Sequence, residues 1–301
     1  MTAQTVPVPG APAADGSGRP AQRTVRAHDV VLAYEEHGGP AGDGSEAPPL
    51  LLVHGHPFDR TLWRPQSAAF PGRRVILPDL RGYGHSGGVP QPGGKTLLEV
   101  YAADLAALLD ALGVPRAVLG GISMGGQIVM EFLRLFPERV AGVVLADTSA
   151  QGESEPARQE RRERADLLER EGMAGYAHAV LDSMITPANA AALPDVAGHV
   201  LGMMLAAPPA GAAAALRGRA ERADRTALLA QIAVPALVVV GREDVFTPVA
   251  DAEFLHARIP GARLAVIDGA GHLPNLERPE AFNAAVAELL AMVPLEDGGE
   301  A

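Results

Sequence analysis

The sequence predicts an α/β fold: a mostly parallel sheet with helices on both faces, interrupted by an all-helical insertion. Short apolar runs of strand length alternate with helical patterns over residues 25–148 and again over 234–293. Alternating strands and helices favour parallel pairing, because a parallel strand needs a long crossover, usually a helix. Between residues 149 and 233 only helical spacing remains. We therefore expect an α/β core at 25–148 and 234–293, with a helical cap at 149–233.

The first half of the core begins with β-prone residues at 25–37, which predict a short β-hairpin. Compact apolar runs at 50–53 and 74–77 each lead into a loop, and each predicts a buried strand. Residues 96–112 carry apolar side chains at helical spacing and predict an amphipathic helix.

The alternation continues to the end of the core. Strands are predicted at 117–119, 140–146, 236–240 and 264–267, and helices at 127–136, 249–259 and 279–292. Within the cap, helical patterns cover 153–171, 173–184, 196–205 and 210–217. The charge-dense segment 153–171 is interpreted as a solvated helix face.

Composition limits the classes of partner. The 301-residue chain has a formal net charge of −11 and no clustered basic patch, which disfavours nucleic acid and anionic membrane surfaces as partners. It contains no cysteine, so disulfides and thiolate chemistry are excluded. No run reaches the roughly 18 apolar residues of a membrane span. Residues 1–24 are interpreted as a disordered tail and 294–301 as a flexible C-terminus, and we expect a cytoplasmic protein.

A G-x-S-x-G pattern at 121–125 places Ser123 between a predicted strand and a predicted helix. In this context the small flanking residues allow a sharp turn that raises the serine hydroxyl above the strand ends, at a helix N-terminus. Ser123 is therefore predicted to be a nucleophile.

A serine hydroxyl needs a base, and the base needs an acid to orient it. His272 follows the last predicted strand, at the edge of the sheet where a base could reach Ser123. Asp244 follows the preceding strand and is the preferred acid. Asp147 is a rival at an equivalent strand end, and Glu243 is a more distant third candidate.

The HGHP motif at 54–57 follows the strand at 50–53. We expect the backbone N–H groups of His56 and Met124 to form an oxyanion hole, and His54 to be a buried structural histidine. A metal role for the two histidines is disfavoured because no further ligand cluster accompanies them. No metal, nucleotide or flavin cofactor is implied.

Together these motifs resemble the α/β-hydrolase superfamily, in particular the branch of 3-oxoadipate enol-lactonases and cofactor-free haloperoxidase-type esterases. The resemblance covers about residues 25–292 and also includes DLRGYGHS at 79–86, which is chiefly a structural loop in that family. It implies an eight-stranded sheet and specifies the fold far better than the substrate. An aspartate in place of Ser123 would resemble haloalkane dehalogenases or epoxide hydrolases instead.

The residues and the resemblance together predict a serine hydrolase that cleaves a small carboxylic ester or lactone through an acyl-enzyme. Perhydrolysis, suggested by Pro57, stays an alternative, as do hydrolysis of a carbon–carbon or peptide bond and a non-catalytic binding role. Formation of a homo-oligomer is left open. Predicted pocket residues are Phe58, Trp63, Phe246 and Leu273, with Met124 from the core and Met173, Met184, Met203 and Met204 from the cap, although such methionines more often pack in a core.

Overall fold

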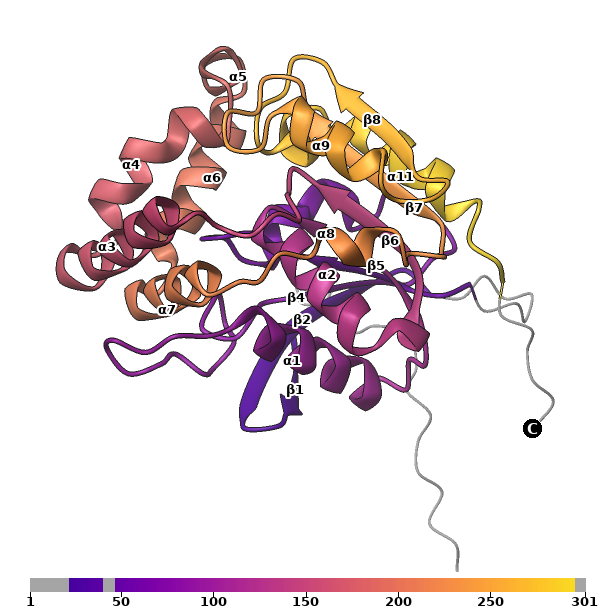
Figure 1. Ribbon diagram of the computed structural model, residues 1–301, viewed down its shortest axis with the longest axis horizontal. Coiled ribbons are helices and arrows are strands. Elements are labelled where there is room, and N and C mark those ends of the chain that lie inside the picture. Colours follow the sequence, from indigo (N-terminus) through magenta and orange to yellow (C-terminus); the bar gives the residue numbers. More distant parts are fainter. Residues whose placement is uncertain (1–21, 40–46, 296–301) are drawn as a thin grey trace, which may run out of the picture.

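The computed structural model describes residues 22–39 and 47–295, arranged around one eight-stranded sheet (Figure 1). The strand order is β1-β2-β4-β3-β5-β6-β7-β8. Strands β3 to β8 are all parallel to one another, whereas β1 pairs antiparallel with β2, and β2 pairs antiparallel with β4. The predicted fold class, a mostly parallel α/β sheet that begins with a hairpin, is confirmed.

The elements follow the predicted order. The strands are β1 (Arg23–Ala27), β2 (Val30–His37), β3 (Leu50–Val53), β4 (Val75–Pro78), β5 (Ala117–Ile122), β6 (Val140–Ala146), β7 (Ala236–Gly241) and β8 (Arg263–Ile267). The helices flanking the sheet are η1 (Arg60–Gln66), α1 (Leu98–Ala111), α2 (Met124–Leu135), η2 (Pro137–Arg139), α8 (Thr226–Leu229), α9 (Val249–His256), α10 (Pro274–Glu277) and α11 (Pro279–Leu290). The predicted cap segment, 149–233, contains five further helices, called the cap helices below: α3 (Glu155–Glu171), α4 (Met173–Met184), α5 (Pro187–Ala192), α6 (Pro194–Ala206) and α7 (Pro209–Ala220).

Strand β3 shows why helices cover both faces of the sheet. Successive side chains of a strand point to opposite faces. Leu50 and Leu52 join the apolar cluster that contains residues of α11 and η1, whereas Leu51 and Val53 join the cluster that contains residues of α1, α2 and α9. All four side chains are buried, so neither face of this strand meets water.

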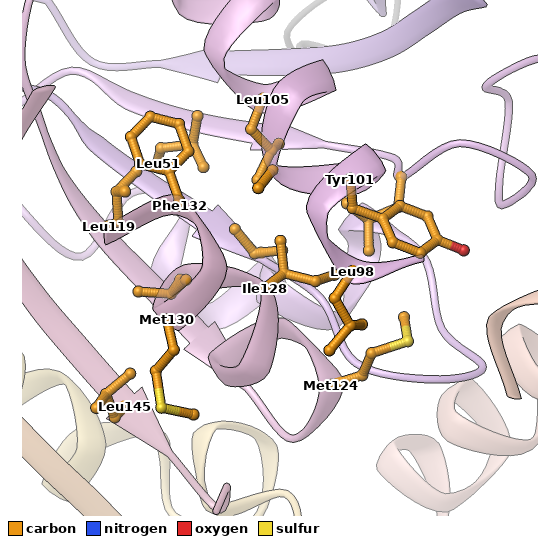
Figure 2. Close-up of a cluster of buried hydrophobic side chains, with 14 of the residues drawn as sticks. Leu51, Leu98, Tyr101, Leu105, Leu119, Met124, Ile128, Met130, Phe132 and Leu145 are labelled. Atoms are coloured by element: carbon orange, nitrogen blue, oxygen red, sulfur yellow. The ribbon is translucent and has the colours of Figure 1, made fainter. Parts of the chain in front are cut away.

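The contact between α1 and α2 is built from apolar side chains at helical spacing. Figure 2 shows Leu98 and Leu105 of α1 gathered with Ile128 and Phe132 of α2, next to Leu119 of the sheet. This packing holds α2 against β5, and it therefore fixes the turn that joins them.

The cap helices lie together at one end of the sheet (Figure 1), where α3 packs against α7 and α4 against α6. Within the described ranges, no single helix is long and apolar enough to cross a membrane. The pair α6 and α7 passes that test of length and composition together, but it is bent by 90°.

Several boundaries differ from the prediction. Helix α2 begins at Met124 rather than at residue 127, because the glycines read as turn residues lie inside the helix. A Cβ on Gly125 would lie 2.2 Å from the carbonyl oxygen of Val53, so glycine is needed for close approach of the helix to β3. Helices η1, η2, α5, α8 and α10 were not predicted. The predicted terminal tails lie mostly outside the described residues, although Arg23 and Thr24 already pair with β2.

Candidate active site

Ser123 stands at the sharp turn between β5 and α2. Its backbone φ is +55°, a region that non-glycine residues rarely adopt. The turn is held from both sides: the Ser123 N–H donates to Ala146 O at 2.9 Å, and the Thr148 hydroxyl donates to Ser123 O at 2.7 Å. A Cβ on Gly121 would lie 2.3 Å from the backbone of Gly125, so the turn closes only with glycine there. The serine is thereby presented at the N-terminus of α2.

His272 and Asp244 form a buried pair in the loops after β8 and β7. The Nδ1 of His272 lies 2.8 Å from Oδ2 of Asp244, and because a carboxylate only accepts, Nδ1–H is the donor. Burial alone would raise the pKa of Asp244, but the charge and hydrogen bond of His272, with hydrogen bonds from Thr247 and the Phe246 N–H, bring it below its usual value. The hydrogen bond therefore fixes the orientation of the ring and leaves Nε2 as the ring nitrogen that is not bonded to Asp244.

Asp147, the rival acid, lies beside this pair rather than in it. Its Oδ1 accepts from the Gly241 N–H at 2.9 Å, while Oδ2 has no partner among the described residues. Burial, followed by the negative charge of Asp244, raises the pKa of Asp147 well above its usual value. Glu243 is exposed. Of the three candidate acids, Asp244 is the one that hydrogen-bonds His272.

Asp147, Asp244 and His272 are the one group in the described part of the chain with metal-ligand spacing, their ligand atoms lying within 4.8 Å of one another. The Asp244–His272 hydrogen bond already uses two of these atoms. This arrangement suits a general base better than a metal centre.

The HGHP segment places its two histidines differently. His54 is fully buried, its Nδ1 lies 2.8 Å from Gly55 O, and its Nε2 accepts from the Leu80 N–H at 3.0 Å, as expected of a structural histidine. The Nδ1 of His56 lies 2.8 Å from the Tyr83 hydroxyl. No acceptor for the His56 backbone N–H is found in the described residues, and the Met124 N–H, in the first turn of α2, has no intrahelical partner.

A cavity of about 390 Å³ joins these groups. Its lining from the core includes His56, Ser123, Asp147, Phe246 and His272. Both Ser123 and His272 are largely buried, and no hydrogen bond joins the serine hydroxyl to the ring in the described structure. The predicted nucleophile and base therefore line one cavity.

The predicted pocket is corrected by this cavity. Three of the predicted pocket residues do not line the cavity: Phe58, Trp63 and Leu273. Their side chains are fully buried in the apolar cluster on the α11 side of the sheet, where they pack against other core residues. Trp63, for example, packs on Phe282 with ring centroids 6.0 Å apart. Of the methionines, Met184 lines the cavity, whereas Met124, Met173, Met203 and Met204 belong to the apolar clusters.

The cap contributes charged side chains that the sequence analysis did not anticipate. Four arginines line the cavity together with acidic and polar residues: Arg161, Arg164, Arg219, Arg222, Glu153, Glu160 and Tyr176. Most of α3 is exposed or half-buried, as expected of a solvated helix face, but Arg161 and Arg164 line the cavity, and the Glu153 side chain, just before the helix, is 6% exposed. Spacing of Arg161 and Arg164 on one helix face was the available signal.

Glu277 connects the loop of the base to the cap. Its Oε1 accepts from the Gly271 N–H at 2.8 Å, one residue before His272. Its Oε2 accepts from the Thr186 N–H at 2.9 Å and from the Asn189 amide at 2.6 Å. The carboxylate is 2% exposed, so these bonds are made in a water-poor environment where they are strong.

Comparison with known proteins agrees with this geometry. Residues 48–279 match the sequence profile of the alpha/beta hydrolase fold. The chain is 32% identical to 3-oxoadipate enol-lactonase 2 of Acinetobacter baylyi, over 89% of this chain and 96% of that protein.

Two solved structures are also similar. A thermophilic esterase from Thermogutta terrifontis, with malate bound, has a TM-score of 0.84 and 38% identity, covering 91% of this chain and 99% of that one. The enol-lactonase from Burkholderia xenovorans LB400 has a TM-score of 0.81 and 30% identity, covering 89% and 100%. With the profile match extending over most of its length, this chain belongs to the α/β-hydrolase fold family and, like these esterase and enol-lactonase relatives, is a hydrolase.

Proposed function

We propose that the chain is a serine hydrolase that cleaves a small carboxylic ester or lactone, with Ser123 as nucleophile, His272 as general base and Asp244 as the acid that orients it. One observation carries the proposal: a serine held at positive φ on a helix N-terminus lines the same cavity as a histidine whose Nδ1 is hydrogen-bonded to a carboxylate. The names of the esterase and enol-lactonase relatives support the choice of an ester or lactone bond.

In the proposed reaction, the Ser123 hydroxyl attacks the substrate carbonyl while Nε2 of His272 takes its proton. The developing oxyanion accepts hydrogen bonds from the backbone N–H groups of His56 and Met124. The bond to the leaving oxygen then breaks as His272 returns the proton to it, leaving an acyl-enzyme. Water activated by the same ring hydrolyses this ester and regenerates the serine.

Labelling with a fluorophosphonate probe, combined with turnover of p-nitrophenyl esters and lactones, tests the proposal. Wild type is expected to be labelled and active, and Ser123→Ala to lose both. Ser149→Ala is a matched control for labelling, because Ser149 lines the same cavity. Absence of labelling in folded wild type, or labelling that survives in Ser123→Ala, would contradict the mechanism.

Adding peroxide and a carbon–carbon bond substrate to the panel tests the other activities that the sequence leaves open. A cytoplasmic location and the lack of nucleic acid or membrane partners stay predictions from the sequence.

A further inference from the structure

Asp147 is a buried carboxyl group that the proposed mechanism does not use. Its side chain is 1% exposed and lines the cavity beside the Asp244–His272 pair. One side-chain oxygen or nitrogen atom from each of these three residues lies within 4.8 Å of the other two. Asp147 and Asp244 follow the ends of β6 and β7, which are neighbours in the sheet. The two carboxyl groups are therefore close enough to affect each other's charge.

The backbone of Asp147 is held in a conformation that few residues adopt. Its φ is +44°, and in the described part of the chain only His28 and Ser123 share a positive φ among residues other than glycine. His28 lies in the turn between β1 and β2, whereas Ser123 is the proposed nucleophile. Such conformations persist where the surrounding structure enforces them, and they cluster at functional sites.

The residues on either side of Asp147 hold the turn of the nucleophile. Ala146 O accepts from the Ser123 N–H at 2.9 Å, and the Thr148 hydroxyl donates to Ser123 O at 2.7 Å. The Asp147 N–H itself donates to Val239 O of β7, at 2.9 Å. The carboxyl group of Asp147 is thereby attached at a fixed position relative to both the turn of Ser123 and strand β7.

The hydrogen bonds of the two carboxyl groups decide which of them is ionised. Asp244 accepts three hydrogen bonds, including one from Nδ1–H of His272 at 2.8 Å. Asp147 accepts one, from the Gly241 N–H to Oδ1. Two carboxylates at this separation repel each other, so the proton is taken by the one whose charged form has fewer donors. Asp147 is therefore the protonated member of the pair.

The surroundings of Asp147 act in the same direction. Burial raises the pKa of Asp147 well above its usual value, the negative charges of Asp244 and Glu277 add to this effect, and the hydrogen bond from Gly241 only partly opposes it. The cap offers no compensating ion pair. Four arginines of the cap line the same cavity, and none is paired with Asp147 in the described residues: Arg161, Arg164, Arg219 and Arg222.

The contacts of Asp147 also show which oxygen carries the proton. Oδ1 accepts from the Gly241 N–H, whereas Oδ2 is buried and has no partner among the residues described. Two carboxylates only accept and cannot bond to each other, but a protonated Oδ2 becomes a donor. A buried polar atom is expected to be paired, and the carboxylate of Asp244 is the acceptor at hand.

Asparagine at position 147 would meet the structural requirements of this position without a second carboxyl group. It adopts positive φ readily, and its amide oxygen could accept from the Gly241 N–H. It could not supply an O–H donor, which bonds to a carboxylate roughly twice as strongly as a neutral pair does. An acid beside Asp244 therefore indicates that its proton is used.

We propose that Asp147 is a positioning residue that, in its protonated form, donates a hydrogen bond from Oδ2 to the carboxylate of Asp244 and so weakens the pull of Asp244 on the proton of His272. This inference rests on the proposed function, because it assigns a partner to the acid of that mechanism. The hydrogen bond spreads the negative charge of Asp244 over two carboxyl groups, so a protonated His272 ring is stabilised less than it would be by an unshared carboxylate.

Two substitutions distinguish a donor from a charge. Asp147→Leu fills a similar space but cannot donate. Asp244 should then attract the His272 proton more strongly, and the acid limb of kcat/KM against pH should move upward by about one unit. Asp147→Asn keeps a weaker donor, so its limb should move by less than about 0.3 unit. A downward move in Asp147→Asn would show that the wild-type group is ionised and would overturn the proposal, as would equal limbs in the two variants.

Glu243→Gln is the matched control for the pH profile. It removes an exposed carboxylate one position before Asp244 in the sequence. Solvent and salt screen an exposed charge, so the limb should move by less than about 0.3 unit. A move as large as that of Asp147→Leu would show that the limb responds to any change nearby, and it would contradict a specific hydrogen bond.

Infrared spectroscopy tests the protonation of Asp147 without any substrate. The difference spectrum of wild type minus Asp147→Asn at pH 7 is expected to contain the carbonyl stretch of a protonated carboxyl group. A carboxylate band in its place overturns the proposal. This measurement does not depend on Asp147→Leu, which leaves the Gly241 N–H without its acceptor and could fail to fold.

Titration of the His272 ring by NMR, in a Ser123→Ala background, keeps the inference distinct from the proposed function. The midpoint should rise in Asp147→Leu and stay unchanged in Asp147→Asn. If no ester is hydrolysed by wild type but the midpoints follow this order, the mechanism fails and the hydrogen bond between the two carboxyl groups stands. If Ser123-dependent hydrolysis occurs but the midpoint falls in Asp147→Asn, the hydrogen bond fails alone.

Discussion

The two walls of the cavity are held by different kinds of interaction. The core wall, formed by the loops after β5, β6, β7 and β8, is fixed by backbone hydrogen bonds such as Ser123 N–H to Ala146 O and Asp147 N–H to Val239 O. The cap wall, formed by α3, α7 and the segments beside them, is held by ion pairs between side chains far apart in sequence, such as Arg222 with Glu153. The geometry that backbone hydrogen bonds impose leaves little room for change by substitution, whereas a substitution can replace either member of a side-chain ion pair. This contrast suggests a constant reaction centre facing an adjustable recognition surface.

The largest expected effect lies in the core wall. Asp244→Asn presents an amide to His272 and favours the wrong tautomer, so kcat for a p-nitrophenyl ester should fall by about 10⁴-fold. Asp147→Asn should reduce kcat by less than about tenfold, because Asp147 makes no hydrogen bond to His272. Steady-state kinetics of both variants measures the difference. Similar losses would mean that both carboxyl groups orient the base.

The cap wall is expected to depend on Glu153 for stability rather than for chemistry. Glu153→Gln leaves Arg161 and Arg222 without their shared carboxylate. The free energy of unfolding should fall by about 3 kcal/mol, the lower end for a broken buried pair, since Glu153 faces a cavity. Urea denaturation measures it. Glu155→Gln, two residues further along the chain but 73% exposed, is the control and should change stability by less than about 0.5 kcal/mol.

The two neighbouring carboxyl groups should give opposite pH dependence. The pKa of Asp147 is raised, so the folded protein keeps a proton that the unfolded chain loses above about pH 4, and this group destabilises the fold as pH rises. The pKa of Asp244 is lowered, so its contribution is present above the usual value of 3.8 and disappears as pH falls through its folded-state pKa.

The free energy of unfolding of Asp147→Asn and Asp244→Asn, measured between pH 3 and pH 8, therefore tests whether the two carboxyl groups have opposite effects on stability. Asp147→Asn should gain stability over wild type as pH rises, because an amide resembles the protonated acid. Asp244→Asn should be less stable than wild type at neutral pH, with the difference vanishing in acid. Parallel curves for the two variants would show that the two carboxyl groups share one environment.

The smallest effect belongs to the solvent side of the cap. Arg170 and Glu171 pair at 2.9 Å with both side chains about 60% exposed. Arg170→Ala should change the free energy of unfolding by less than about 0.5 kcal/mol in urea, and the change should shrink in high salt. A larger loss would show that ion pairs on the outer surface of the cap stabilise it more than those that face the cavity.

Local patterns explain what could be predicted. The eight strands, Ser123, His272 and Asp244 all follow from short apolar runs and from the residues directly after them, because strand ends meet at one edge of a parallel sheet. Contacts between distant segments explain the failures. Trp63 reads as a pocket aromatic, but it packs on Phe282, which is 219 positions later in the chain.

Arg219 was missed for the same reason. It lies in an alanine-rich helix with no charge pattern of its own, and its partner Gln127 is 92 residues away. Whether such a cation is neutralised depends on side chains from three separate segments. No spacing within one segment carries that information.

The hydrogen bonds of Glu277 limit which caps could be exchanged between this protein and its relatives. A cap grafted from another hydrolase would have to present a backbone N–H and an amide where Thr186 and Asn189 now stand, or the carboxylate would be left buried with unused acceptors. The loss of these hydrogen bonds would disturb the bond from Glu277 to the Gly271 N–H, and so the position of the neighbouring His272 ring. The cap helices and the loop of the proposed base are thus not separable modules in this protein, because one buried carboxylate joins them.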